Sequence, residues 1–196
     1  MPVATYPGTV TPLRGLGCFA ESERDVFFGR EREREELARL VTSQSFRAGL
    51  LYGEAGVGKS SLLRAGLQPD LRDQGVVALV CSDNSQPLNS LAQALSVATG
   101  LSPNDRETAT AFLARVVGEG AQMYLFILDD IDLAMQNDER VTAEIAEIFT
   151  RVASRAAGRA RFLFACASER VHRFAALELR TGSLFPPTSR YELGRM

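Results

Sequence analysis

The sequence contains a single histidine, His172, and three widely spaced cysteines, Cys18, Cys81 and Cys166. None of these residues has a neighbour at a spacing typical of a metal site built from cysteine and histidine. The odd number of cysteines favours free thiols in a reducing compartment over a disulfide framework, so we expect a cytoplasmic protein. We interpret His172 as an ordinary surface or capping residue.

Long apolar runs and an excess of one charge are also missing. No stretch approaches 18 apolar residues, and the N-terminus has no apolar h-region, so we expect neither a membrane partner nor a secretory signal peptide. The net charge of −2 gives no electrostatic argument for nucleic acid as the main partner. The 196 residues, 45% apolar and 23% charged, suffice for one globular α/β domain with a short extension.

Short apolar runs alternate with helical patterns along the chain. Four runs predict strands buried on both faces, and a fifth short strand is expected near 191–193. Helical periodicity begins at Glu31 and returns in four later segments. The predicted strands are 49–52, 76–81, 124–128, 161–166 and 191–193, and the later helices are 61–73, 88–99, 107–118 and 139–157. This alternation predicts an α/β fold with a mostly parallel five-stranded sheet flanked by helices.

A phosphate-binding motif follows the first predicted strand and precedes a helix. It has the form G-x-x-x-x-G-K-S and consists of Gly53, Glu54, Ala55, Gly56, Val57, Gly58, Lys59 and Ser60, with Ser61 opening the helix. Glycines let the backbone N–H groups surround phosphate oxygens, and the helix N-terminus adds partial positive charge. We therefore expect a P-loop in which Lys59 reaches the terminal phosphates and the Ser60 hydroxyl holds Mg²⁺.

The third predicted strand ends in acidic residues, the Walker B pattern. Asp129 is expected to hold the Mg²⁺ shell, and Asp130 or Asp132 could orient or deprotonate the attacking water. A whole strand and its helices lie between the P-loop and this strand, so the two need not be neighbours. This organisation is typical of additional-strand P-loop ATPases. A GTPase is less well supported, because the chain has no N-K-x-D guanine-specificity motif.

Three linked segments resemble one family. Residues 12–19 with Phe28, Gly29, Arg30 and Glu31, the stretch 58–67 with Pro69, and the tail 189–194 are similar to the bacterial novel STAND NTPase group, which is related to origin-recognition-like AAA+ ATPases. The resemblance implies that Phe28, Gly29 and Arg30 contact the adenine of ATP or ADP. Residues 1–30 would then be a tail and adenine-binding segment, and 31–196 the P-loop core of a longer protein.

The resemblance implies a signalling switch in which ATP binding permits assembly and slow hydrolysis resets it. Self-association would depend on nucleotide and on parts outside this chain. One departure concerns hydrolysis: relatives often carry an arginine where this chain has Ala167, and Arg170 lies three residues further on. Two alternatives stay open, a nucleotide-binding interaction module without significant hydrolysis and a small-molecule P-loop kinase.

Overall fold

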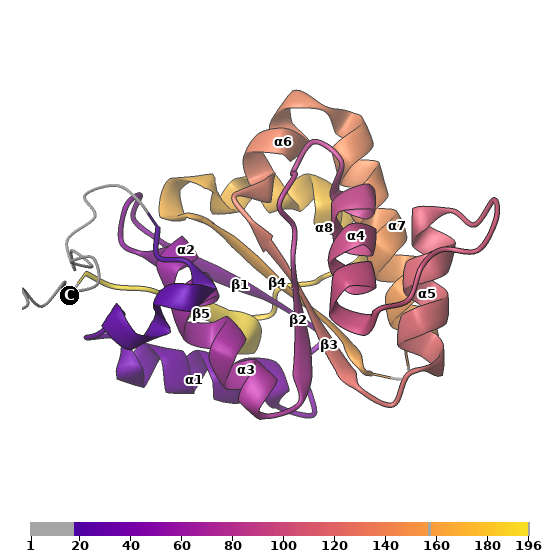
Figure 1. Ribbon diagram of the computed structural model, residues 1–196. Helices are drawn as coiled ribbons and strands as arrows, with labels where there is room; N and C mark the ends of the chain where they lie inside the picture. The colour runs from indigo at the N-terminus through magenta and orange to yellow at the C-terminus, as the bar shows by residue number, and fades with distance from the viewer. Residues whose placement is uncertain (1–17, 157, 196) are drawn as a thin grey trace, which may run out of the picture.

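The computed structural model describes residues 18–156 and 158–195. Five parallel strands form one sheet in the order β2-β3-β4-β1-β5 (Figure 1). The strands are β1 (Ala48–Gly53), β2 (Val76–Val80), β3 (Met123–Asp129), β4 (Ala160–Ala167) and β5 (Arg190–Glu192). All five coincide with predicted strands to within a few residues, and the α/β fold class is confirmed.

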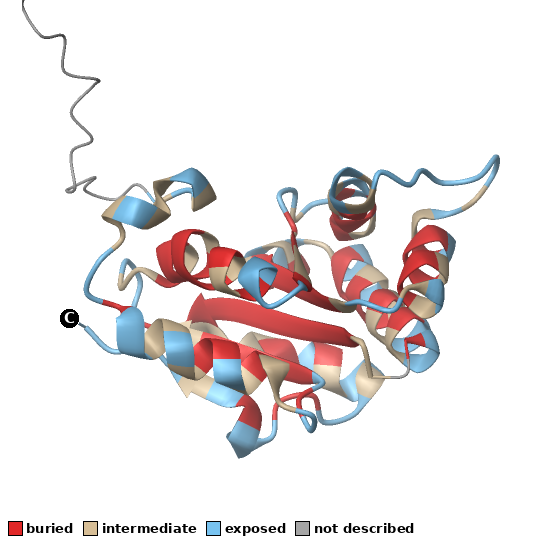
Figure 2. Cartoon of the chain, turned by 60° about the horizontal axis from the view of Figure 1, so that its bottom comes forward, coloured by how far each residue is buried: buried red, intermediate tan, exposed pale blue. Residues whose placement is uncertain are grey.

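The strand order places β4 between the P-loop strand β1 and the acidic strand β3. The additional strand is therefore β4, which comes later in the sequence, whereas β2 lies at the edge of the sheet. All eight residues of β4 are buried, as expected for a central strand covered on both faces (Figure 2). The carboxyl ends of β1, β3 and β4 consequently meet at one edge of the sheet.

Helices cover both faces of the sheet (Figure 1). On one face lie α4 (Pro87–Thr99), α5 (Ala109–Glu119), α6 (Ile131–Asn137), α7 (Glu139–Arg155) and α8 (Ala175–Thr181). The other face is covered by α1 (Glu31–Thr42), the π-helix η2 (Leu62–Leu67) and α3 (Gln68–Asp73). Among these described elements, no helix has both the length and the hydropathy needed to cross a bilayer.

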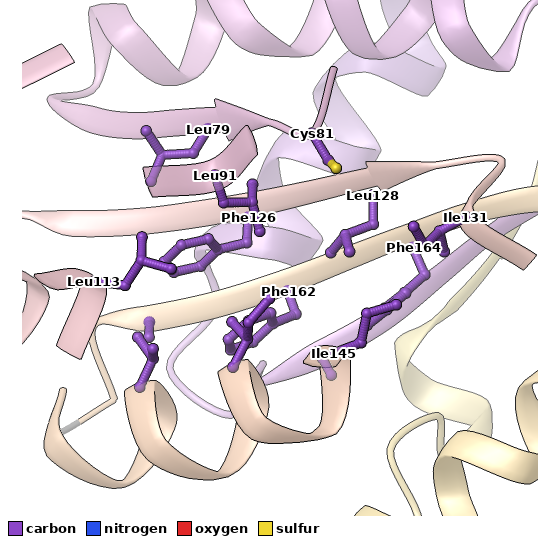
Figure 3. Packing of buried hydrophobic residues seen from close by; sticks show 14 of the residues in the cluster. Leu79, Cys81, Leu91, Leu113, Phe126, Leu128, Ile131, Ile145, Phe162 and Phe164 are labelled. Atoms are coloured by element: carbon purple, nitrogen blue, oxygen red, sulfur yellow. The ribbon is translucent and has the colours of Figure 1, made fainter. Parts of the chain in front are cut away.

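Aromatic rings fill the larger of the two core clusters. The rings of Phe126 on β3 and Phe162 on β4 stack at 4.9 Å between centroids (Figure 3). Ile145 of α7, on the buried stripe of this amphipathic helix, belongs to the same cluster. This packing fixes the relative positions of β3 and β4, from whose carboxyl ends the acidic residues and Arg170 project.

The predicted helix over 61–73 is present as one unbroken helical run, in which α2 (Lys59–Ser61), the π-helix η2 and α3 follow one another. The sequence does not predict two 3-10 helices, η1 (Glu21–Val26) and η3 (Ser168–Phe174). It also does not predict the short helices α6 and α8. The short 3-10 helix η4 (Pro187–Ser189) leads into β5.

Candidate nucleotide-binding site

The P-loop joins the end of β1 to the start of α2. Gly56 and Gly58 have φ angles of 77° and 98°, in the region that favours glycine, and Gly58 is the N-cap residue that precedes α2. An added Cβ at either position would meet open space, so the loop surface is clear at both glycines. The loop can therefore offer backbone N–H groups to an anion without steric obstruction.

Lys59 lies beneath this loop and is nearly buried, with 7% of its surface exposed. Its ammonium group donates hydrogen bonds to the carbonyls of Gly53, at 3.1 Å, and Glu54, at 2.9 Å. These two hydrogen bonds hold the ammonium group against the loop. The sequence predicts that Lys59 contacts the terminal phosphates of a nucleotide at this loop.

Asp129 and Ser60 face each other at the end of β3. The Ser60 hydroxyl hydrogen-bonds to the Asp129 carboxylate, while Asp129 Oδ1 is buried and has no partner among the described residues. Burial raises the pKa of Asp129, and the Ser60 hydrogen bond partly opposes that increase. A buried carboxylate oxygen without a donor, beside a hydroxyl, fits the oxygen ligands that Mg²⁺ prefers.

Asn84 contributes a third polar side chain to this edge, and no sequence motif indicates it. It lies in the loop after β2, and its amide donates to the Asp129 carbonyl at 2.8 Å. Its Oδ1 atom is buried without a hydrogen-bond partner in the described part of the chain. The only available signal is that Asn84 closely follows a strand of the parallel sheet.

Asp130 and Asp132 differ sharply in exposure. The Asp130 side chain is 46% exposed and its Oδ1 atom lies 2.5 Å from Arg170 Nη2. Asp132 is fully buried, and its Oδ2 atom lies 3.2 Å from both Arg170 Nε and Arg173 Nη1. Burial raises the pKa of Asp132, and the positive charge of Arg170 opposes this increase. Of the two acids, Asp130 is the one that a water molecule can approach.

The structure also shows where Ala167 lies relative to the P-loop. Ala167 ends β4 directly opposite Gly53, the first residue of the P-loop, and is buried. A side chain here adjoins the phosphate loop, but a methyl group carries no charge. Arg170 lies one turn further along in η3 and is the nearest arginine along the chain after β4.

The segment before α1 contacts the P-loop through Arg30. Phe28 is 70% exposed, and Gly29 adopts a φ of 86°. Arg30 is buried and donates to the carbonyls of Val57, at 3.1 Å, and Gly194, at 2.9 Å. Arg30 thus joins the start of α1, the P-loop and the segment after β5. The Arg30 side chain therefore contacts the protein backbone, whereas the ring of Phe28 is exposed.

A hollow of about 300 Å³ lies beside these contacts, lined by Arg30, Arg195 and the P-loop residues 54–57. Glu54 and Arg195, both in its lining, form an ion pair. The last predicted site residue, Ser61, is buried, and its hydroxyl accepts a hydrogen bond from the Phe19 backbone N–H at 3.1 Å. Its side chain therefore holds the N-terminal segment against the P-loop helix.

Solved structures of other proteins resemble this fold. The ORC2 protein of Aeropyrum pernix, in its ADPNP and ADP complexes, matches with a TM-score of 0.65 and 20% identity, over 86% of this chain and 48% of that one. A Walker-type ATPase of Pyrococcus abyssi matches with a TM-score of 0.60 and 16% identity, over 91% and 57%. A chain of the Drosophila origin recognition complex bound to DNA matches with a TM-score of 0.57 and 19% identity, over 89% and 45%.

These similarities show a shared fold, and this chain spans about half the length of each structure. The comparison with curated protein sequences finds no match. The sequence model described as Novel STAND NTPase 1 matches residues 12–196, which is nearly the whole chain. The chain belongs to the novel STAND NTPase family, and it is a nucleotide-binding P-loop module.

Proposed function

We propose that this chain is the ATP-binding switch module of a STAND-type signalling ATPase, which binds Mg-ATP and hydrolyses it slowly to control assembly. The observation that carries the proposal is the arrangement of Lys59, Ser60 and Asp129 at the carboxyl ends of β1 and β3, on either side of β4. An ammonium group held against a phosphate loop lies at the same edge of the sheet as a hydroxyl and a buried carboxylate oxygen that has no hydrogen-bond partner in the described part of the chain. Together they provide a place for a polyphosphate and its divalent cation.

Each residue has a separate role in this proposal. The P-loop backbone and Lys59 bind the phosphates, while Ser60 and Asp129 hold Mg²⁺. When bound, Mg²⁺ would neutralise charge on the phosphate oxygens. Asp130, half-exposed at the strand end, would orient the attacking water. Phe28, in the N-terminal segment of residues 1–30, would stack on the adenine, next to the core formed by residues 31–196.

Thermal unfolding with and without nucleotide tests the proposal. A ligand at 100 times its dissociation constant stabilises a protein by about 2.7 kcal/mol, which for this size raises the melting temperature by roughly 5 °C or more. We expect Mg-ATP and Mg-ADP to produce such a shift, and Lys59→Ala to abolish it because the charge facing the phosphates is lost. A shift that persists in Lys59→Ala would exclude this site.

A second function, nucleotide binding without significant hydrolysis, is favoured by a specific observation. Ala167 supplies no charge next to the P-loop, and Arg170 is engaged with Asp130 and Asp132. The chain would then act as an interaction module whose partners respond to the bound nucleotide. Steady-state phosphate release separates the two functions.

A further inference from the structure

The outer side of β2 is an open edge of the sheet. Among the described strands β2 pairs only with β3, and the Cys81 N–H donates to the Ile127 carbonyl at 2.9 Å. Backbone groups of successive residues alternate between the two sides of a strand, so Val76, Ala78 and Val80 direct theirs away from β3. These N–H and C=O groups have no hydrogen-bond partner in the described part of the chain. Such a row of unpaired groups is a template for another strand.

This edge also lacks the residues that usually keep strands of different molecules apart. The five residues of β2, Val-Val-Ala-Leu-Val, include no charged residue and no proline. Natural sheet edges are commonly protected by lysine, by proline or by a covering element. Here α3 and α4 pack on the two faces of β2 (Figure 1). The helices therefore cover the faces of the strand, while its outward hydrogen-bonding groups keep no partner.

The surroundings of the edge are nearly free of charge. Residues 74–104 contain one charged residue, Asp83, although 23% of the whole chain is charged. Helix α4, which packs on β2, presents Asn89, Gln93 and Val97 to solvent, and Val97 is 82% exposed. Solvent-facing helix surfaces normally carry charged side chains, whereas the centres of protein interfaces are depleted of them. The composition therefore favours contact with another protein surface.

The spacing of the outward groups is self-complementary. An antiparallel copy of β2 centred on Ala78 places Val76 opposite Val80 of that copy and Ala78 opposite itself. Opposed residues that point toward each other exchange both hydrogen bonds, so every outward group would be paired. A residue near a two-fold axis meets its own image, and an uncharged strand does so without repulsion. Asp83 follows the strand, and its carboxylate accepts from Ser85 N–H at 2.9 Å and Ser85 Oγ at 2.6 Å in its own loop.

We propose that two copies of this chain pair through the outer edges of β2, antiparallel about a two-fold axis beside Ala78. The two five-stranded sheets would form one continuous sheet, and the two copies of α4 would lie side by side over the junction. The family resemblance implies self-association through parts outside this chain, whereas this edge belongs to the chain itself. The pairing needs no nucleotide, because β3 and β4 separate β2 from the P-loop strand β1.

Sedimentation of the full 196-residue chain without nucleotide, over a series of concentrations, tests the pairing. We expect a monomer–dimer equilibrium with no larger species, because two-fold pairing uses the open edge of both copies. Ala78→Pro removes the central outward N–H and should raise the dissociation constant of the dimer by about tenfold or more. Ala78→Ser is the matched control, because it retains this N–H and should keep the dimer. Thermal unfolding of each variant shows whether the fold is kept.

A charge exchange at the axis tests the register. Ala78→Lys and Ala78→Glu each place two like charges opposite each other, so each variant alone should be monomeric. A mixture of the two variants should recover a dimer, because the opposed charges then attract. Leu179→Lys is the control: it charges another apolar residue, 89% exposed, on α8, which packs on α7, and should leave the dimer in place.

The outcomes decide between this pairing and other uses of the edge. A wild-type chain that stays monomeric at every concentration would overturn the dimer and would mean that a different protein covers β2. Species that grow beyond a dimer would show open-ended strand addition and would also overturn it. A dimer that persists in Ala78→Lys would place the contact elsewhere. If Ala78→Pro unfolds, the lysine and glutamate variants, which retain the N–H, decide the result. No nucleotide is present, so these results leave the proposed function of the P-loop untouched.

Discussion

Asp129 is the residue on which any metal dependence of this site should rest. Its Oδ1 atom is buried without a partner among the described residues, and the amide of asparagine is a poor ligand for a hard cation. We expect Asp129→Asn to remove the Mg²⁺-dependence of ATP binding, measured by calorimetry with and without the cation. Asp138→Asn, at the start of α7, is a control that should retain it. Retained Mg²⁺-dependence in Asp129→Asn would mean that another group holds the metal.

Gly53 and Gly56 are two P-loop glycines that the structure requires for different reasons. A Cβ at Gly53 would lie 2.4 Å from the carbonyl oxygen of Leu193, whereas a Cβ at Gly56 would meet open space and only its φ of 77° is strained. We expect Gly53→Ala to reduce the free energy of unfolding by about 3 kcal/mol or more and Gly56→Ala by about 1 kcal/mol. Urea denaturation measures both. Equal losses would show that Leu193 can move away from β1.

Sequence reasoning locates residues within a motif but cannot locate their partners. The P-loop and Asp129 are recognisable because spacing alone identifies them. The contact between Asn84 and the Asp129 carbonyl depends on β2 and β3 being neighbours, and the Arg170–Asp130 pair joins residues 40 apart. The role of Arg30 as a link to Val57 and Gly194 likewise depends on the folded chain.

At the scale of elements, the N-terminal helix η1 is fixed to α3 by a few ion pairs. Asp70 accepts from Arg24 at 2.9 Å and pairs with Arg34 at 2.8 Å, and its side chain is 14% exposed. Asp73 also pairs with Arg24, but its side chain is 64% exposed. Together with the Phe19–Ser61 hydrogen bond, these contacts hold the segment before α1 against the P-loop helix.

We expect Asp70→Asn to loosen η1 and to cost about 1–3 kcal/mol, because two guanidinium groups lose a partly buried partner. Asp73→Asn should cost less than about 0.5 kcal/mol, as is usual for an exposed pair. Limited trypsin digestion would detect the difference as faster cleavage after Arg24 in Asp70→Asn. Identical digestion of the two variants would mean that ion pairs do not hold η1.

The elements that the sequence predicts well are those with a repeated hydrophobic pattern. The central strand β4 is continuously apolar apart from Arg161, and α7 keeps a regular buried stripe over 17 residues. The short elements η1, η3 and α6 offer only about two turns each, too few to establish a period. The helix that contains η2 is predicted, but its π-helical hydrogen bonding is not, because its apolar residues suit an α-helix equally well. Within η2, Gly66 lies close to Phe27, a contact that only the fold reveals.

At the scale of the whole molecule, nucleotide binding and catalysis depend on different parts. Every group that we assign to binding lies at the carboxyl ends of β1, β3 and β4 or in the segment before α1. The structures with a similar fold are about twice as long as this chain. Groups that accelerate hydrolysis in P-loop proteins are often supplied from outside the core, as with an arginine from a second protein. Binding by this chain therefore does not require that it hydrolyse ATP efficiently.

We expect the chain to bind ATP but to release phosphate at less than about one turnover per minute, far below the median of about 10 s⁻¹ for enzymes. Ala167 places no charge beside the P-loop, and Arg170 is already paired with Asp130 and with buried Asp132. Steady-state phosphate release, with Lys59→Ala as the background, measures the turnover. Turnover above about 1 s⁻¹ that disappears in Lys59→Ala would show that the core alone stabilises the transition state.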